Sequence, residues 1–249
     1  MRDIFARHSR ATLFFSAGKD SLACLLLLKD YWSQIDVVWA NPGAPYPEVE
    51  AYMRRIASLV PSFVELGGEQ PQWIAAHGWP ADVVPVRSTA SGEAGAGPAD
   101  VRFQPYFSCC GHNMWQPMQR HLDSAKPGLV IMGQRREETL RNRMRDERLQ
   151  TLDDVEYFQP INEWTAAQVF AYLESQGAEL PPLYEHGLDS SPDCWNCTAY
   201  LDHNQARLKR MRAHEPLRWT VIQPALQSLQ RAIEQQTAPL DALLNHPKD

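Results

Sequence analysis

Short, continuous apolar runs recur along the chain, separated by longer stretches with helical character. Four runs have the length of a buried strand: residues 11–15, 35–40, 62–66 and 128–133. The stretches with helical length or periodicity are residues 21–32, 47–60, 164–177, 206–215 and 221–236. Strands that alternate with helices favour a parallel sheet covered by helices. The pattern therefore predicts an α/β, doubly wound parallel sheet with a helical extension at the C-terminal end.

Local signals refine this pattern. Pro47 falls near the first turn of one predicted helix, and Thr165 and Gly177 flank another as cap residues. Residues 88–100, STASGEAGAGPAD, are small, polar and rich in glycine. They predict a flexible surface loop, which is either idle or the lid of a nearby site.

The composition is that of an ordinary globular protein. The 249 residues include 30 acidic and 24 basic ones, a formal net charge of −6, which argues against a nonspecific nucleic-acid coat. No apolar stretch approaches the roughly 18 residues of a membrane span, and the first ten residues lack the apolar core of a secretory signal. We therefore expect a cytoplasmic protein with no membrane partner.

The stretch SAGKDS, which begins at Ser16, lies between the first predicted strand and its helix. Backbone N–H groups and the helix dipole favour an anion at such a turn. Gly18 lets the backbone approach a phosphate, Ser16 and Ser21 offer hydroxyl donors, and Lys19 neutralises negative charge. The stretch is neither a Walker A loop nor a GxGxxG fingerprint. The alternative is a tight turn in which Asp20 or Ser21 caps a core helix.

Four of the five cysteines form two pairs. Cys109 and Cys110 are adjacent, and Cys194 and Cys197 make a CxxC. Two such pairs can supply four thiolates to zinc or to a [4Fe-4S] cluster, although adjacent cysteines are awkward for either because neighbouring side chains tend to point apart. Four unligated thiols are the remaining alternative. Cys24, in the apolar run of the first helix, is predicted to be a core residue.

Six arginines crowd one window: Arg135, Arg136, Arg141, Arg143, Arg145 and Arg148. The first of them follow the predicted strand 128–133, so they reach the same sheet edge as SAGKDS. Guanidinium groups bind phosphate or sulfate oxygens bidentately, and we predict ligand contacts for Arg135, Arg136 and Arg143. The alternative is a solvated helix with i,i+4 ion pairs.

These segments together resemble the PP-loop family of ATP pyrophosphatases and phosphoadenylyl-sulfate reductases. SAGKDS is similar to its SGGKDS signature, with Ala17 in place of the first glycine. NPGAPYPEVEAYM resembles DTGxxFPET, GQRREETLRNR resembles GxRRxxS, and the run from PINEWT to PPLYEHGLDSSPDCWNCT resembles the family's last motif, so that residues 11 to about 200 are covered. The resemblance implies the Rossmann-like adenine nucleotide α-hydrolase fold. It also implies phosphate binding by Ser16, Ala17, Gly18, Lys19, Asp20 and Ser21.

The same resemblance bears on the cysteines. Assimilatory adenylyl-sulfate reductases carry a [4Fe-4S] cluster on a CC pair followed by CxxC, which implies cluster ligation by Cys109, Cys110, Cys194 and Cys197, with zinc as the alternative. Those reductases attack the sulfonucleotide with a cysteine in a C-terminal ECGLH-like motif. No cysteine follows Cys197 in this sequence, which weakens the reductase interpretation.

The GKDS form of the turn is closer to the ATP pyrophosphatase branch. We therefore expect an enzyme that binds ATP with Mg²⁺ and cleaves it to AMP and pyrophosphate, with Lys19 and Asp20 as catalytic residues. Asp20 would hold the metal or cap the helix. Adenylation of an acceptor would serve iron-sulfur-dependent sulfur transfer of the nucleic-acid thiolation or phosphorothioation type, with a cysteine desulfurase or another sulfur donor protein as partner.

Two alternatives stay open. One is an adenylyl-sulfate or phosphoadenylyl-sulfate reductase with an atypical thiol source, and the other is a non-catalytic nucleotide- or redox-sensing subunit. For the organisation of the chain we predict a nucleotide-binding domain with the iron-sulfur site at residues 1–203. A C-terminal helical extension would occupy residues 204–249.

Overall fold

The structure is a computed structural model that describes residues 1–137, 147–180, 184, 188 and 193–245. By internal packing the chain divides into two compact units. We call Met1–Asn41, Pro45–Gly68 and Met114–Asp193 the sheet unit, and Pro42–Ala44, Glu69–Asn113 and Cys194–Asp249 the cysteine unit. This division differs from the boundary expected between residues 203 and 204, which stays a prediction.

Within its described residues the sheet unit contains six strands in the order β3-β2-β1-β6-β8-β7. They are β1 (Ala11–Phe14), β2 (Ile35–Asn41), β3 (Phe63–Gly67), β6 (Leu129–Met132), β7 (Leu149–Leu152) and β8 (Val155–Phe158). Neighbouring strands are parallel except β7 and β8, which are antiparallel at one edge. The four strands predicted from apolar runs are confirmed, and the central β1 carries SAGKDS at its carboxyl end.

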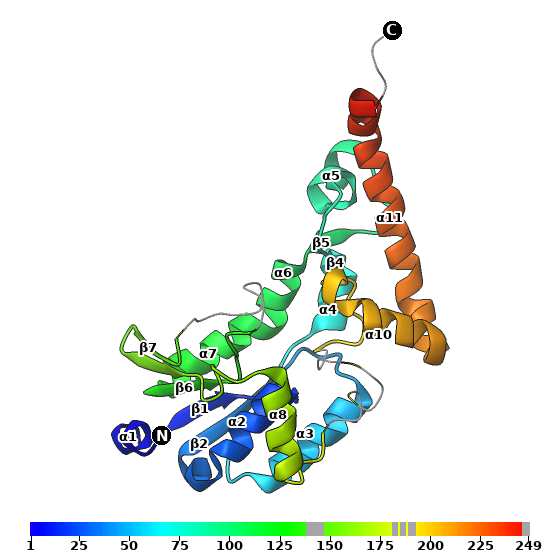
Figure 1. The fold of residues 1–249 in the computed structure, drawn as a ribbon. Coiled ribbons are helices and arrows are strands. Elements are labelled where there is room, and N and C mark those ends of the chain that lie inside the picture. Colours follow the sequence, from blue (N-terminus) through cyan, green and yellow to red (C-terminus); the bar gives the residue numbers. More distant parts are fainter. Residues whose placement is uncertain (138–146, 181–183, 185–187, 189–192, 246–249) are drawn as a thin grey trace. The chain divides into compact units, whose positions relative to one another are not determined.

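Helices flank this sheet (Figure 1). They are α1 (Arg2–Arg7), α2 (Lys19–Leu27), α3 (Pro47–Leu59), α7 (Gln116–Ala125) and α8 (Ala166–Ser175). The predicted cap of α8 is confirmed, because Thr165 Oγ1 accepts from Gln168 N–H at 3.2 Å while the Gln168 side chain accepts from Thr165 N–H at 2.8 Å. The helix predicted over residues 21–32 is shorter than expected, since α2 ends at Leu27 and a 3₁₀ turn covers Lys29–Gln34.

The core of the sheet unit lies on its central strands, which are buried on both faces. Leu13 of β1 and Ile131 of β6, which pair in register, are fully buried. Cys24 on α2 is also fully buried, as predicted for a core residue. Burial raises the pKa of its thiol far above the ordinary value, so this cysteine is protonated at neutral pH.

The β7–β8 hairpin is not anticipated by the sequence prediction. Asp153 and Asp154 join its strands with φ values of 49° and 65°. Aspartate tolerates this left-handed conformation better than most residues, and tight hairpin turns need it. The pair of aspartates between LQTL and VEYF is therefore the sequence signal for this edge of the sheet.

The cysteine unit is built on a small parallel sheet of β4 (Trp79–Ala81) and β5 (Phe103–Pro105). Its helices include α4 (Gln70–His77), the 3₁₀ turn Val86–Ser88, α5 (Ala90–Ala96), α6 (Tyr106–Cys110), α10 (Leu201–His214) and α11 (Pro216–Asn245). A π-helix, Gly111–Trp115, follows α6. Leu229 of α11 packs on Ala81 and Phe103, which gives this unit its own apolar cluster.

The loop predicted over residues 88–100 is wrong in its central part. α5 forms there because Thr89 Oγ1 accepts from Gly92 N–H at 3.0 Å, while Gly97 ends the helix with a φ of 87°. Glu93 on this helix pairs with Arg102. Among the residues described, no helix has the length and apolar character needed to cross a membrane.

Candidate functional site

SAGKDS forms the turn between β1 and α2, at the carboxyl end of the central strand. Gly18 is the N-terminal cap residue of α2 and has an extended conformation. Ala17 before it is fully buried and has a φ of 59°, in the left-handed region. Glycine adopts this conformation at lower cost than alanine. The departure from the family's SGGKDS signature thus falls on the position where glycine would be least strained.

Two serine hydroxyls brace this turn. Ser21 Oγ donates to Gly18 O at 3.0 Å and lies 3.3 Å from Ser16 N–H, which donates to it. Ser16 Oγ accepts from Gly18 N–H at 3.4 Å. No side chain among the described residues caps α2, and Asp20 instead accepts from two cations. The alternative in which Asp20 or Ser21 caps the helix is therefore wrong.

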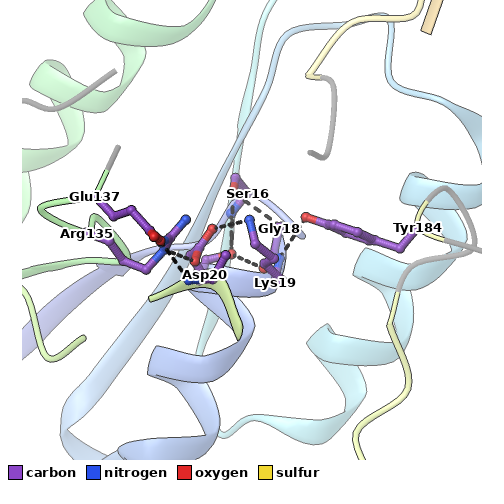
Figure 2. A network of polar contacts seen from close by, with 9 residues as sticks. Ser16, Gly18, Lys19, Asp20, Arg135, Glu137 and Tyr184 are labelled. Carbon is purple, nitrogen blue, oxygen red and sulfur yellow. Dashed lines mark hydrogen bonds and ion pairs between the residues drawn. The ribbon is translucent and has the colours of Figure 1, made fainter. Parts of the chain in front are cut away.

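A chain of alternating charges runs from the turn to the residues after β6 (Figure 2). Asp20 Oδ2 accepts from Lys19 Nζ at 2.9 Å, and Asp20 Oδ1 accepts from Arg135 Nε at 2.6 Å. Arg135 Nη1 donates to Glu137 Oε2 at 2.6 Å, and the same oxygen accepts from Ala166 N–H at 2.8 Å. The Ala166 N–H, followed by the Arg135 guanidinium, holds the pKa of Glu137 below its ordinary value. These contacts tie α8 and the end of β6 to the first turn of α2.

Aromatic side chains also contact Lys19. Its backbone N–H donates to Tyr184 Oη at 2.9 Å, and Figure 2 shows this hydroxyl pointing at the start of α2. Lys19 Nζ lies 5.9 Å from the ring centroid of Phe170, and that ring meets the Tyr184 ring edge-on at 6.3 Å. Sequence reasoning assigned no role to Tyr184, Phe170 or Glu137. The only signal for Tyr184 is its place in PPLYEHG, a segment that resembles a family motif.

The turn opens into a cleft of about 1220 Å³ within the sheet unit. Its walls include residues 38–40 at the end of β2, the start and one face of α7, and the β7–β8 hairpin. Trp115, Met118 and Leu122 give it an apolar side. Ordinary small-ligand pockets measure roughly 300–1,000 Å³. The cleft therefore has room for a nucleotide-sized ligand and part of a second molecule.

Gly133, directly after β6, packs against the turn. A Cβ atom at this position would lie 2.7 Å from Ser21 N and 2.8 Å from the carbonyl carbon of Asp20. The end of β6 and the start of α2 are thus in backbone contact. This contact helps to explain how Arg135, two residues later, reaches Asp20.

The predicted ligand arginines occupy different places. Arg135 is buried and lies on Asp20, whereas Arg136 is exposed and its side chain pairs with Glu163 at 2.9 Å. Arg148, at the start of the hairpin, is exposed. Arg143 lies outside the described residues together with Arg141 and Arg145. The structure brings Arg135 to the turn and leaves ligand contact by any of these arginines a prediction.

All four paired cysteines belong to the cysteine unit. Cys109 and Cys110 end α6, and Cys194 and Cys197 precede α10. Cys109 is buried, and burial together with the nearby Cys197 raises the pKa of its thiol to about 12. Asn113 Nδ2 donates to Cys109 O at 2.9 Å and lies 3.8 Å from Cys109 Sγ. The fold thus brings one cysteine of each pair close enough to interact.

A buried arginine braces the CxxC turn. Arg207 donates to Trp195 O and to Cys197 O, each at 2.5 Å. Four sulfur donors in one unit suit a cluster or zinc by their chemistry. However, the part of the chain that the structure describes contains no group of three or more His, Cys, Asp or Glu side chains that could hold a metal ion. The thiols therefore do not form a closed ligand set in this conformation.

The phosphoadenosine phosphosulfate reductase domain family matches residues 10–200, which include the SAGKDS turn and both cysteine pairs. The chain belongs to this family. The residues of the turn and those that line the cleft all fall within the matched range.

The individual proteins that match the chain do so over part of its length or at low sequence identity. Adenosine 5'-phosphosulfate reductase of Burkholderia cepacia is 33% identical over 92 residues, which is 36% of this chain and only 36% of that protein's length. Phosphoadenylyl-sulfate reductase from Candida auris, solved as a phosphate complex, matches with a TM-score of 0.56 and 15% identity over 77% of this chain and 85% of that one. FMN adenylyltransferase of Candida glabrata with FAD and inorganic pyrophosphate gives a TM-score of 0.49 and 12% identity over 77% of this chain and 57% of that one. The likeness to the Candida auris enzyme confirms the α/β fold class predicted from the sequence.

Proposed function

We propose that this chain is an enzyme that binds ATP and uses it to adenylate an acceptor, with AMP and pyrophosphate as the products of ATP, in a sulfur-transfer reaction. The observation that carries the proposal is the turn at the start of α2, where Lys19, Asp20 and two serine hydroxyls line a nucleotide-sized cleft. The GKDS form of this turn resembles that of ATP pyrophosphatases. Membership of the phosphoadenosine phosphosulfate reductase family supports the binding of an adenine nucleotide.

In this proposal the β and γ phosphates bind at the turn. The first N–H groups of α2 and the positive end of its dipole attract phosphate oxygens. Lys19 Nζ, which pairs with Asp20 in the ligand-free turn, would share its charge with the phosphates. The hydroxyls of Ser16 and Ser21 line the same cleft and add donors.

The chemical step is an in-line displacement at the α phosphorus. An oxygen of the acceptor forms a bond to this phosphorus while the bond to the bridging oxygen breaks, and pyrophosphate leaves with the bonding electrons. Lys19 stabilises the charge that develops on the leaving group. Asp20 is the carboxylate of the turn that would hold Mg²⁺, which would supply further charge neutralisation. Arg135 would keep the Asp20 carboxylate in place.

We further propose that Cys109, Cys110, Cys194 and Cys197 hold a [4Fe-4S] cluster, with zinc as the alternative. Support comes from the proximity of Cys109 and Cys197, from the bracing of the CxxC turn by Arg207, and from the CC then CxxC order. Binding requires the thiols to lose their protons and to converge. A bound cluster would carry sulfur or electrons, or act as a structural and electrostatic element.

The acceptor and the donor follow from the type of reaction. We propose a nucleic-acid acceptor, as in thiolation or phosphorothioation, and a cysteine desulfurase or another sulfur donor protein as partner in the cytoplasm. The exposed Arg148 and the arginines before it would contact the nucleic acid, and such contacts weaken with salt.

Sulfonucleotide reduction is the second candidate, favoured by the adenosine 5'-phosphosulfate reductase that matches part of the chain. That reaction needs a thiol to attack the sulfonucleotide. Cys24 is fully buried with a raised pKa, so it cannot supply the thiolate. A thiol from another protein would have to serve.

Product analysis of the anaerobically purified protein distinguishes these functions. One sample receives Mg-ATP and the other adenylyl sulfate with reduced thioredoxin. We expect AMP and pyrophosphate from the first sample, and their loss in Lys19→Gln. Lys29→Gln, a control on an exposed lysine outside the cleft, should keep the activity. Sulfite from the second sample would establish the reductase instead, and nucleotide binding without either product would indicate a sensing subunit.

Iron and acid-labile sulfide per chain test the cluster independently of turnover. We expect about four of each per chain, as a [4Fe-4S] cluster requires, and broad visible absorption. Cys194→Ser should lose both, whereas Cys24→Ala should keep them. One zinc per chain without sulfide would show that the site holds zinc and not a cluster. Absence of both metals would refute a ligand role for the four cysteines.

A further inference from the structure

Tyr184 occupies a position that the proposed reaction does not use. Its Oη accepts a hydrogen bond from Lys19 N–H at 2.9 Å. Lys19 is the first residue of α2, and N–H groups in the first turn of a helix have no partner within the helix. A phenol oxygen therefore lies where this N–H would otherwise bind an oxygen of a ligand.

We propose that the Tyr184 hydroxyl takes the place of a phosphate oxygen in the ligand-free turn, and that a phosphate-bearing ligand must displace it. Tyr184 is then an internal competitor of the phosphate at the nucleotide site. This inference rests on the proposed function only in that the turn must bind phosphates.

Neighbouring side chains hold the hydroxyl in this position. The Tyr184 ring meets the ring of Phe170 edge-on, with 6.3 Å between centroids, and Lys19 Nζ lies 5.9 Å from the Phe170 centroid. Phe170 belongs to α8, whose first N–H is bound by Glu137. The charge chain that fixes Asp20 thus also positions α8, whose Phe170 supports Tyr184. The Tyr184 hydroxyl and the phosphate-binding groups are therefore held by the same set of contacts.

The strengths of the competing hydrogen bonds decide which ligands displace the hydroxyl. The bond between Lys19 N–H and Tyr184 Oη joins two neutral groups, whereas a phosphate oxygen would make a charge-assisted bond about twice as strong. A sugar hydroxyl has no such advantage over the phenol. Displacement of Tyr184 therefore costs every ligand at the turn the same hydrogen bond, and a phosphate replaces that bond with a stronger one.

Tyr184→Phe tests this idea because it removes the hydroxyl and keeps the ring. The free variant no longer makes a bond that contributes about 0.5–1.5 kcal/mol net, so phosphate ligands should bind roughly 2- to 10-fold more tightly. Titration calorimetry with Mg²⁺ would compare pyrophosphate, α,β-methylene-ATP and adenosine. We expect the same factor for the two phosphate ligands, because the lost bond belongs to the free protein, and no change for adenosine.

Tyr52→Phe is the matched control. The Tyr52 hydroxyl donates to Glu179 O at 3.1 Å, and Tyr52 does not line the cleft. This variant also loses one phenol hydrogen bond within the sheet unit, and it should bind all three ligands with wild-type affinity. Its thermal midpoint, measured beside that of Tyr184→Phe, shows whether any change in affinity follows from general destabilisation.

Each outcome decides the matter. Weaker binding of pyrophosphate to Tyr184→Phe would mean that the hydroxyl contacts the ligand, and unchanged binding would mean that it does not compete; either result overturns the inference. Tighter binding of phosphate ligands to Tyr184→Phe, together with a wild-type chain that forms no AMP and pyrophosphate from ATP, would sustain the inference and refute the proposed reaction. Binding of no phosphate ligand to either protein would refute both.

Discussion

Substitution of Gly133 tests the packing that positions the SAGKDS turn. A Cβ at Gly133 would lie 2.7 Å from Ser21 N, 2.8 Å from Asp20 C and 2.9 Å from Ser21 Cα. All three are backbone atoms of the first turn of α2, so no side chain can rotate away. Favourable carbon contacts begin near 3.5 Å, so Gly133→Ala must separate the end of β6 from the turn by roughly 0.7 Å.

The displacement sets the expected magnitudes. Overpacking of this kind lowers the free energy of unfolding by about 1–3 kcal/mol. The effect on the reaction should be larger in proportion, because misplacement of a site by about 1 Å can reduce a rate on the order of 100-fold. Urea unfolding measures the first effect, and AMP formation from Mg-ATP together with calorimetry of pyrophosphate binding measures the second.

Gly67→Ala provides the control. Gly67 ends β3 at the same edge of the sheet, and a Cβ there would meet no heavy atom within 4 Å. Its stability should change by less than about 0.5 kcal/mol, and its activity should be retained. A Gly133→Ala protein with wild-type stability and wild-type pyrophosphate affinity would refute the view that β6 and α2 are in fixed contact. Equal losses of stability and activity in Gly133→Ala and Gly67→Ala would also refute the role of this contact.

Three further predictions concern other parts of the chain. Ala17→Gly should raise the free energy of unfolding by up to about 1 kcal/mol, because the left-handed conformation costs alanine roughly 1–2 kcal/mol and the greater backbone entropy of glycine offsets part of the gain; a loss of stability in urea would contradict it. The hydrogen bond from His8 lowers the pKa of Glu156 from 4.5, so Glu156 stabilises the fold above that pH and loses this contribution as the pH falls through the lowered pKa. Wild type should therefore exceed Glu156→Gln by about 1 kcal/mol or less at pH 7 and by less in acid, and a difference independent of pH would argue against this. Arg207→Leu leaves two partly buried carbonyls of the CxxC turn, Trp195 O and Cys197 O, without their donor and should cost about 1–3 kcal/mol; an unchanged melting temperature would show that the bracing is not needed.

The apolar pattern predicts the sheet because its central strands are buried on both faces. Continuous runs such as residues 128–133 leave little choice but a buried strand, and β6 indeed covers Leu129–Met132. The cap of α8 is equally local, since Thr165 and Gln168 are three residues apart. The loop expected over residues 88–100 fails for the opposite reason. A prediction from composition gives more weight to its glycines than to the Thr89 cap. In the structure, the cap and the pairing of Glu93 with Arg102 suffice for one short helix.

Only the part of the site that is formed by neighbouring residues can be predicted from the sequence. The residues of SAGKDS are neighbours in sequence, so their turn can be recognised as a unit. Tyr184 reaches Lys19 across 165 positions of the chain, and Arg135 reaches Asp20 across 115. Such contacts depend on the order of the strands and on the packing of α8. A pattern that places Arg135 at the correct sheet edge cannot show that its partner there is a carboxylate.

The charges around the cleft bear on which ligands it can accept. Among the described residues that line it, the acidic ones outnumber the basic ones: Asp20, Asp123, Asp153, Asp154 and Asp193 against Lys19 and Lys126. Lys19 is already paired with Asp20, and Arg135 is paired with both Asp20 and Glu137. A free polyphosphate would therefore enter a cleft with an excess of negative charge, where the helix dipole alone offers a modest attraction. The arrangement favours ATP bound as its magnesium complex, since the metal brings the positive charge that the side chains of the cleft do not supply. It also disfavours a long polyanion along the β7–β8 hairpin, so the nucleic-acid acceptor that we propose would have to present a single nucleotide to the cleft.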